Sequence, residues 1–415
     1  ATRGRRQVRV LVIPSWWPHR CYPWEGVFIQ EQVRAISELR PDWSIAVALW
    51  GQGEGFVSSA HFRHSPRCLF DALALRPSER ATAANVTEIM TPALWWPERA
   101  LGGNKRALLA SCRETLRRAR HVMGGVDVIH AHGSYPAGWL AMGLSHETGI
   151  PYVITEHMGP FPLPVYARLD GRLKPILAEP LARAGARIAV SPALAERIAS
   201  FGLPAPEVIP NLVDERRYPL ASHPARDTFE FYTLAWIDPS KGIGDLLEAI
   251  ALLAARLPPA ERARLKFRIA GGGPALERFR ARARALAIAD LAEFPGQLER
   301  DAARAGFARC DAFVLPSRHE SFGIVYVEAL VCGRPVVATR CGGPEWIVTP
   351  DAGVLVPVRD APALADALDF VRGNARSYDA AAIRRHAIER FGREAVVSAI
   401  ESIYRRVAAR AAPAA

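Results

Sequence analysis

The sequence predicts an α/β protein made of two β/α/β domains that face a cleft. Three observations predict this fold class: a length of 415 residues, short apolar strands alternating with longer helical patterns, and a break in that alternation at 214–227. At about 150 residues per domain the chain is long for one core, and the alternation is typical of parallel sheets. The break holds Pro219 and Pro224 among charged residues, as linkers often do. We therefore expect one domain at 1–213 and another at 228–392.

The charge and cysteine content of the chain limit the kinds of binding partner that we expect. The formal net charge is +11 and the isoelectric point is near 9.7, so we expect a polyanionic partner: nucleic acid, an anionic membrane face or phosphorylated substrates. The arginines are spread among Ala- and Leu-rich helices without a basic tail that interleaves aromatics, which argues against nucleic acid. The six cysteines form no C-x-x-C pair, so we expect reduced thiols and no zinc site.

The hydropathy of the sequence predicts where the protein is located in the cell. No apolar run approaches the roughly 18–20 residues of a membrane helix, and the first apolar block, at 8–13, is too short for the core of a signal peptide. We expect a cytoplasmic protein that can associate peripherally with the inner face of the membrane.

The first half of the chain opens with a strand, a polar loop and a helix. A strand at 8–14 leads into a loop with Trp16 and Trp17, and Gly26 precedes a helix at 27–39. A glycine at a helix N-terminus lets a phosphate approach the unpaired backbone N–H groups. Each tryptophan either stacks on a sugar acceptor or packs in the core, and the sequence leaves both readings open.

The rest of the first half continues this alternation, apart from an irregular stretch broken by prolines between the second strand and residue 99. The further strands and helices that we expect are 44–49, 100–122 (helix), 127–132, a helix from Ala137, 152–155, 187–190, 193–201 (helix) and 207–209.

The helix expected at 100–122 is basic and amphipathic. Its cationic residues are Lys105, Arg106, Arg113, Arg117, Arg118 and Arg120. Such a helix can lie on an anionic bilayer, and an ordinary helix with a solvated basic face is the alternative.

Histidines lie at the carboxyl ends of two of these strands. His130 and His132 close one strand, and His157 follows Glu156 after the next strand. This edge of an open α/β sheet is where ligands bind. A zinc site is the other use of three histidines, but no H-x-x-x-H pair supports one, so we predict no metal.

The second half repeats strand and helix in register, and a Gly-rich turn around Gly272 follows its second strand. The expected strands are 231–235, 265–270, 291–294, 312–315, 335–339 and 353–356, and the expected helices are 244–256, 275–286, 301–309, 324–333, 361–372, 378–391 and 393–408.

The most informative junction lies between the strand at 312–315 and the helix that starts near Ile324. Gly323 leaves room for an anion at the helix N-terminus, and Glu320 and Glu328 flank this start. As a glycosidase pair the carboxyl groups would be about 5–5.5 Å or 6.5–9.5 Å apart, whereas eight helical residues span roughly 12 Å. The two carboxylates are therefore expected to bind different parts of one extended ligand.

These residues carry a resemblance to a known family. The segment from Glu320 to Glu328 resembles the E-x7-E signature of the retaining nucleotide-sugar glycosyltransferases of the GT-B-fold family 4. Residues 208–214, Lys241 with Gly242, 270–274, and Gly342 with Gly343 resemble further landmarks in the family's order. The resemblance implies two Rossmann-like domains and a last helix, 393–408, that packs back on the first.

The resemblance also implies roles for individual residues. Glu320 holds hydroxyls of the donor sugar, His132 lies near that sugar, and Lys241 binds the diphosphate; these are the expected catalytic residues. The expected donor-binding residues are Gly26, Gly272, Arg318, Ser321, Phe322, Gly323, Ile324 and Glu328, and the expected sugar or acceptor contacts are His157, Trp16 and Trp17.

One position departs from the family pattern. Trp236 stands where the family has an arginine that binds the diphosphate, and Arg318 is a candidate to compensate for it. This departure suggests an unusual donor, compensation by Arg318, or loss of activity.

From these residues we expect retaining, metal-independent hexosyl transfer from a UDP- or GDP-sugar to an acceptor hydroxyl. No cofactor is expected besides this co-substrate. The setting expected is surface polysaccharide or glycolipid assembly, with a lipid-linked glycan as acceptor. A sugar-nucleotide epimerase of the same fold and an inactive nucleotide-sugar-binding protein are the alternatives, whereas a pyridoxal-dependent phosphorylase has no support.

Overall fold

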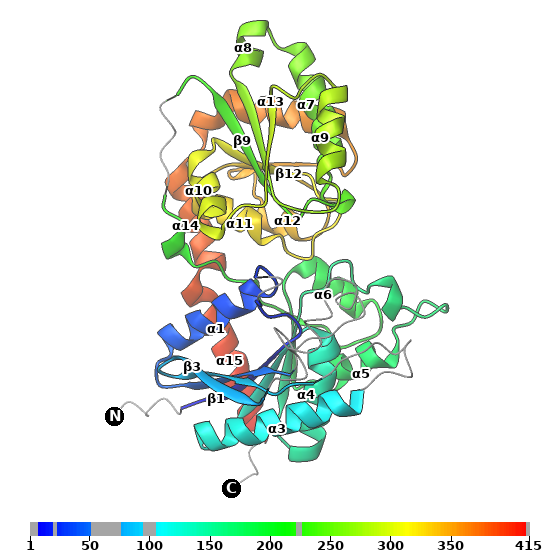
Figure 1. Cartoon of the computed structure of the whole chain (residues 1–415), viewed down its shortest axis with the longest axis vertical. Helices are drawn as coiled ribbons and strands as arrows, with labels where there is room; N and C mark the ends of the chain where they lie inside the picture. The colour runs from blue at the N-terminus through cyan, green and yellow to red at the C-terminus, as the bar shows by residue number, and fades with distance from the viewer. Residues whose placement is uncertain (1–6, 20–22, 51–75, 94–104, 221–225, 412–415) are drawn as a thin grey trace. The chain divides into compact units, whose positions relative to one another are not determined.

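A computed structural model describes most of the chain, and Figure 1 shows its course. The described residues are 7–19, 23–50, 76–93, 105–220 and 226–411. They form two compact units. Unit 1 comprises residues 1–190, 195–210 and 396–415, and unit 2 comprises 191–194 and 211–395.

Unit 1 contains an eight-stranded sheet in the order β3-β4-β2-β1-β5-β6-β7-β8. Its strands pair in parallel except β3 with β4, which are antiparallel. The strands are β1 (Arg9–Pro14), β2 (Ser44–Leu49), β3 (Ser78–Ala83), β4 (Val86–Met90), β5 (Val128–His132), β6 (Tyr152–Glu156), β7 (Ala186–Ala189) and β8 (Glu207–Val208). Strands β1, β2, β5 and β6 are almost wholly buried, which agrees with the near-continuous apolar sequences of β1 and β2.

The helices of unit 1 follow the strands in the chain. They are α1 (Val27–Leu39), α3 (Lys105–Met123), α4 (Trp139–Thr148), α5 (Pro175–Arg183), α6 (Pro192–Ala199) and α15 (Arg393–Ala411), with short turns η2 (Ser134–Gly138) and η3 (Pro164–Tyr166). Most of α15 belongs to unit 1 although it ends the chain, and the first residues of α6, up to Leu194, belong to unit 2. Glu401 of α15 accepts a hydrogen bond from Arg40, which caps α1, at 2.5 Å.

Unit 2 contains a six-stranded parallel sheet in the order β11-β10-β9-β12-β13-β14. Its strands are β9 (Phe229–Leu234), β10 (Leu265–Ala270), β11 (Ala292–Gly296), β12 (Ala312–Leu315), β13 (Val336–Thr339) and β14 (Gly353–Val356). Its helices are α7 (Ile243–Arg256), α8 (Pro259–Ala263), α9 (Leu276–Ala285), α10 (Arg300–Arg309), α11 (Ile324–Val331), α12 (Gly343–Ile347), α13 (Ala361–Asn374) and α14 (Ala380–Phe391), with turns η4 (Glu215–Arg217), η5 (Pro239–Lys241) and η6 (Ala375–Ser377).

The sequence-based prediction missed the hairpin of β3 and β4. All six residues of β3 are exposed, so its sequence lacks the apolar alternation that marks a half-buried strand. The prediction also missed α5 and α8, and it began α4 at Ala137, where the structure has the turn η2 before the helix. The segment predicted as a linker begins with Asp214, which is buried and forms ion pairs with Arg216 and Arg217 in unit 2.

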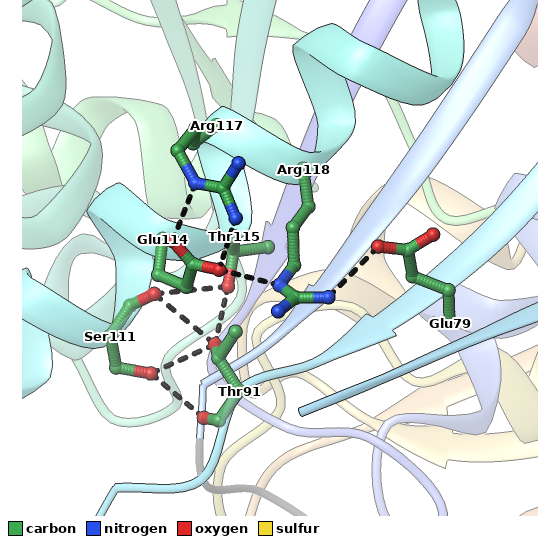
Figure 2. Close-up of polar contacts among 7 residues, drawn as sticks. All are labelled: Glu79, Thr91, Ser111, Glu114, Thr115, Arg117 and Arg118. Atoms are coloured by element: carbon green, nitrogen blue, oxygen red, sulfur yellow. Dashed lines mark hydrogen bonds and ion pairs between the residues drawn. The ribbon is translucent and has the colours of Figure 1, made fainter. Parts of the chain in front are cut away.

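Helix α3 is held by a buried polar contact and by ion pairs (Figure 2). Ser111 and Thr115 face the end of β4, where the Ser111 hydroxyl donates to the Thr91 carbonyl at 2.8 Å and the Thr91 hydroxyl donates to the Ser111 carbonyl at 3.2 Å. On the outer side, Arg117 and Arg118 both donate to Glu114.

These ion pairs reduce the charge that the helix offers to an anionic surface. The bonds from Arg117, and secondarily from Arg118, lower the pKa of Glu114 to about 2, so this carboxylate stays ionised at neutral pH. Arg118 also contacts Glu79, and Arg113 binds Glu147 through two hydrogen bonds of 2.8 and 2.6 Å. The basic face predicted from sequence is thus partly neutralised.

The described residues also bear on membrane crossing and on the state of the cysteines. Within the described ranges, no helix is both long enough and apolar enough to cross a membrane. The cysteines described, Cys112, Cys310, Cys332 and Cys341, are free thiols, and Cys21 and Cys68 lie outside the described residues.

Candidate functional site

Each sheet has a point where the strand order reverses, and ligands bind open α/β sheets at such points. In unit 2 the reversal falls between the neighbouring strands β9 and β12, and in unit 1 between β1 and β5. The loops that leave the carboxyl ends of these four strands carry most of the residues that the sequence singled out.

In unit 2, the loop after β12 is tied to the loop after β13. Glu320 pairs with Gly342 as an isolated parallel bridge, in which the Gly343 N–H donates to the Glu320 carbonyl at 2.9 Å. The Glu320 N–H donates to the Cys341 carbonyl at 3.2 Å. The backbone of Glu320 is therefore fixed from both sides.

The Glu320 side chain forms an ion pair with Lys241 from the loop after β9. Oε1 of Glu320 lies 2.7 Å from Nζ of Lys241 and accepts a hydrogen bond of 2.8 Å from the Ser317 hydroxyl. Burial alone lowers the pKa of Lys241, but the charge and hydrogen bond of Glu320 outweigh it, so the net shift is upward. The lysine is therefore a permanent cation at physiological pH, beside the carboxylate.

Helix α11 begins next to this ion pair. Gly323 precedes it in a left-handed conformation (φ 92°), and a Cβ there would lie 2.4 Å from the ring of Tyr326, so the position requires glycine. Ser321 and Phe322 lie just before this cap and Ile324 opens the helix. The first N–H groups of a helix have no intrahelical partners and attract anions.

Phe322 packs in the core of unit 2. Its side chain is 2% exposed and its ring lies 5.8 Å from that of Phe391. A contact from this residue to a donor would come from its backbone.

Glu328 lies on the second turn of α11. Its carboxylate accepts a hydrogen bond from the hydroxyl of Tyr218. The two glutamates of the E-x7-E signature therefore have different partners, as expected if they bind different parts of a ligand.

The other expected donor residues of unit 2 lie on neighbouring loops. Arg318 forms a bidentate ion pair with Asp245 of α7, with closest atoms 3.0 Å apart. Gly272 follows β10, and its N–H donates to the side-chain oxygen of Gln297 at 3.0 Å. Trp236 follows β9 and is about half exposed.

In unit 1, the buried His132 and the half-buried His157 form a pair at the carboxyl ends of β5 and β6. Nδ1 of His132 lies 3.0 Å from Nε2 of His157, and the two rings stack with centroids 5.3 Å apart. Burial lowers the pKa of His132 well below its usual value, and the neighbouring His130 and His157 lower it further. His132 is therefore neutral at physiological pH.

His130 supports this pair from within the core. One ring nitrogen lies 2.5 Å from the hydroxyl of Tyr404 on α15 and the other 2.8 Å from the hydroxyl of Thr155. Its ring centroid lies 4.2 Å from that of His132. Burial lowers the pKa of His130 to about 3.

Glu156 is a site residue that the sequence argument passed over. Its fully buried carboxylate accepts hydrogen bonds of 2.8 Å from the N–H groups of both His157 and Met158, and one of 2.9 Å from the N–H of Ser134. It thereby fixes the loops that follow β5 and β6. An acidic residue at the end of a buried strand was the available signal.

The loop after β1 brings Trp16 and Gly26 to the same edge of the unit 1 sheet as the histidine pair. Trp17, from the same loop, is buried. The ring of Trp16 meets that of His157 edge-on with centroids 6.4 Å apart. Gly26 caps α1 with φ 69°, and a Cβ there would lie 2.3 Å from the Trp16 carbonyl oxygen. Trp17 is only 5% exposed, so core packing is favoured over stacking on a sugar acceptor for this residue.

The metal prediction stays a prediction. Across the part of the chain that the structure describes, no three His, Cys, Asp or Glu side chains are grouped so as to hold a metal ion.

Comparison with protein families gives two matches that cover most of the chain in order. Residues 70–217 match the model described as Glycosyltransferase Family 4, and residues 221–389 match that described as Glycosyl transferases group 1. The chain is 32% identical over 320 residues to the D-inositol 3-phosphate glycosyltransferase of Saccharomonospora viridis, an alignment that covers 69% of this chain and 71% of that protein.

Solved structures show the same fold at lower identity. Sucrose-phosphate synthase from Thermosynechococcus elongatus has a TM-score of 0.72 at 20% identity, covering 98% of this chain and 100% of that one. Anabaena HepE, in complex with UDP and glucose, has a TM-score of 0.67 at 18% identity, covering 96% and 100%. The expected GT-B fold class is confirmed. The chain belongs to glycosyltransferase family 4, the nucleotide-sugar glycosyltransferases whose E-x7-E signature its sequence carries.

Proposed function

We propose that this glycosyltransferase is a retaining, metal-independent hexosyltransferase that moves a sugar from a UDP- or GDP-sugar to an acceptor hydroxyl. The observation that carries the proposal is the ion pair of Lys241 and Glu320 beside the N-terminus of α11. A cation and helix N–H groups suit a diphosphate, and a carboxylate suits sugar hydroxyls.

The catalytic roles of these groups follow from the negative charge that develops on the leaving diphosphate. The bond between the anomeric carbon and the phosphate oxygen breaks, the acceptor oxygen bonds to that carbon, and the hydroxyl proton passes to the departing phosphate. Lys241 and the N–H groups near Gly323 stabilise the diphosphate more in the transition state than in the ground state. Lys241 is held in place by Glu320 before the donor arrives, so little reorganisation is required.

Retention is the outcome that we infer for the anomeric carbon. Double displacement needs a carboxylate nucleophile on the opposite face of the sugar, and Glu320 is already committed to Lys241 and Ser317. Attack from the face that the phosphate leaves is consistent with this arrangement. As the family resemblance implies, we assign the donor-sugar hydroxyls to Glu320 and His132, and the ribose to Glu328.

The relatives support a hexose and a nucleotide donor. The HepE structure contains UDP and glucose, and the Saccharomonospora relative is named for transfer to an inositol phosphate. We place the reaction in the cytoplasm, in assembly of surface polysaccharide or glycolipid on a lipid-linked acceptor.

Trp236 bears on the alternative of an inactive binding protein. Arg318 can replace the missing arginine only if it leaves Asp245, where it is bound in this structure. Activity would refute the alternative of an inactive binding protein.

The test has two stages. Thermal shift with UDP-, GDP- and ADP-sugars identifies the donor, since a ligand at about 100 times its Kd adds about 2.7 kcal/mol. Products made with the best donor are then analysed by NMR for anomeric configuration. An α-linked product from an α-linked donor supports the proposal, and inversion refutes it. Conversion of the donor to another nucleotide sugar would favour an epimerase, and binding without turnover would favour an inactive binder.

A further inference from the structure

The loop from Met158 to Lys174, which connects β6 to α5 in unit 1, exposes large apolar side chains. Leu163, Val165 and Leu169 are 38%, 53% and 111% exposed. A single exposed apolar side chain needs no explanation, but three within residues 163–169 of one loop mark a contact surface.

The base of this loop is well packed. Phe161 is 3% exposed, its ring lies 6.0 Å from that of Phe201, and its carbonyl accepts a hydrogen bond of 3.0 Å from Arg197. Leu173, at the other end, is also buried. The loop therefore buries the apolar residues at its base and leaves others outside.

Hydrogen bonds close the tip into a defined turn. Ala167 and Leu173 form an antiparallel bridge, and the Arg168 N–H donates to the Arg172 carbonyl at 2.8 Å. The Lys174 N–H donates to the Tyr166 carbonyl, also at 2.8 Å. The exposure of Leu169 is thus imposed by a built turn that presents its side chain to solvent.

The same turn is basic. Arg168, Arg172 and Lys174 are exposed, and Asp170 is the one acidic residue between 163 and 174. Asp170 lies 3.5 Å from Arg168 and accepts the N–H of Arg172. Two positive charges remain in excess over this segment.

We propose that residues 163–174 form a membrane-contact loop for an anionic lipid surface. Leu163, Val165 and Leu169 enter the boundary between headgroups and acyl chains, while the neighbouring cations bind lipid phosphates. Apolar side chains flanked by Arg and Lys are the combination that interfacial binding requires.

Helix α3 fits this role less well. Arg113, Arg117 and Arg118 are engaged by Glu side chains of unit 1, and Val122 is the one large apolar side chain exposed among the described residues of α3. Helix α3 therefore offers weaker attraction and little apolar surface to insert.

The position of the loop suggests its use. It begins directly after His157, at the edge of the sheet where the histidine pair lies. Binding of this loop would hold that edge near the lipid surface. The inference concerns binding alone, so it can fail or succeed independently of the proposed function.

The test is flotation of the purified protein with vesicles of phosphatidylcholine alone or with phosphatidylglycerol added. The loop variant is Leu163→Ser, Val165→Ser, Leu169→Ser. The matched control is Leu252→Ser, Phe370→Ser, which removes side chains that are 38% and 55% exposed on unit 2. Circular dichroism and thermal unfolding verify that each variant is folded.

Wild type and the control should bind anionic vesicles, and the loop variant should need at least roughly a hundredfold more lipid. Burying one large apolar side chain is already worth about tenfold. A triple variant of the loop, Arg168→Glu, Arg172→Glu, Lys174→Glu, should remove most of the salt dependence of vesicle binding. A triple variant of α3, Arg113→Glu, Arg117→Glu, Arg120→Glu, should bind nearly as well as wild type.

Three outcomes would overturn the proposal. They are equal binding by wild type and the loop variant, loss of binding in the α3 variant alone, and no vesicle binding by wild type. In the last case, dimers of wild type that the loop variant abolishes, seen by light scattering, would assign the loop to a second copy of the chain instead.

Discussion

Lys241 and Glu320, which are 79 residues apart in the chain, form an ion pair with Nζ and Oε1 2.7 Å apart. They follow β9 and β12, the neighbouring strands between which the order of the unit 2 sheet reverses. The pair is largely buried, with side-chain exposures of 23% and 13%. Removing one partner leaves the other charge in a poorly solvated place.

Lys241→Met should therefore destabilise unit 2 by about 3 kcal/mol, since breaking a buried ion pair from one side is costly. Lys241→Met combined with Glu320→Leu should recover much of this loss, because no unpaired charge is then buried. Urea unfolding of wild type and of the single and double variants measures the coupling. Lys266→Met, at a half-buried lysine whose ammonium donates to the Asp290 carbonyl, is the control. Equal losses in the single and double variants would contradict the argument.

The same pair predicts a stability change in alkaline solution. The pKa of Lys241 is raised in the folded state, so its contribution is fully present below the unfolded value of about 10.4 and is lost as the pH rises through the folded value. Above about pH 10.4, the denaturation midpoint of wild type should therefore fall faster than that of the double variant Lys241→Met, Glu320→Leu. Parallel curves for the two proteins would count against the predicted linkage.

Glu328→Ala should weaken binding of the free nucleoside diphosphate about tenfold, because we assign Glu328 to the ribose. Glu320→Ala should spare nucleotide affinity and lower kcat. Calorimetry and initial rates test both changes. Tyr218→Phe removes the hydroxyl that contacts Glu328 but keeps the ring, which separates loss of the carboxylate from loss of its support. Unchanged nucleotide affinity in Glu328→Ala would refute the assignment.

Turnover should persist after treatment with EDTA, because Lys241 and the N–H groups at α11 provide the positive charge for the diphosphate. Initial rates with and without chelator measure this directly. Complete loss of activity that Mg²⁺ or Mn²⁺ restores would disprove it, and a parallel thermal-shift assay would reveal whether the chelator unfolds the protein.

His130 should make unit 1 sensitive to acid. Burial lowers its pKa to about 3, below an unfolded value of about 6.5, so between these values the unfolded state binds more protons. Above about pH 6.5 it is neutral in both states, and below that value this histidine lowers the stability by roughly 1.4 kcal/mol per pH unit of acidification. His130→Gln should flatten this dependence, measured by urea unfolding from pH 7 to 4, whereas His146→Gln on the exposed face of α4 should not. A slope unchanged in His130→Gln would contradict the prediction.

The strands and their polar ends could be predicted from local sequence. Buried parallel strands such as β2 and β12 are short apolar runs bounded by turn residues, and their predicted bounds agree with the structure. Gly323 and Glu320 stood out because a glycine at a helix start and a carboxylate beside it have a chemical meaning without knowledge of the fold. The exposed strand β3 lacks such a pattern, and it was missed.

The sequence alone determined the family, the alternation of strands and helices, and which residues are candidates for the site. Only the tertiary structure decided which of them meet. Strand order places the loops after β9 and β12 side by side, so Lys241 finds Glu320, and it places β5 beside β6, so His132 finds His157. Sequence periodicity reports which face of a strand is buried but carries no information about which strand lies next to it, because that choice depends on packing between distant segments.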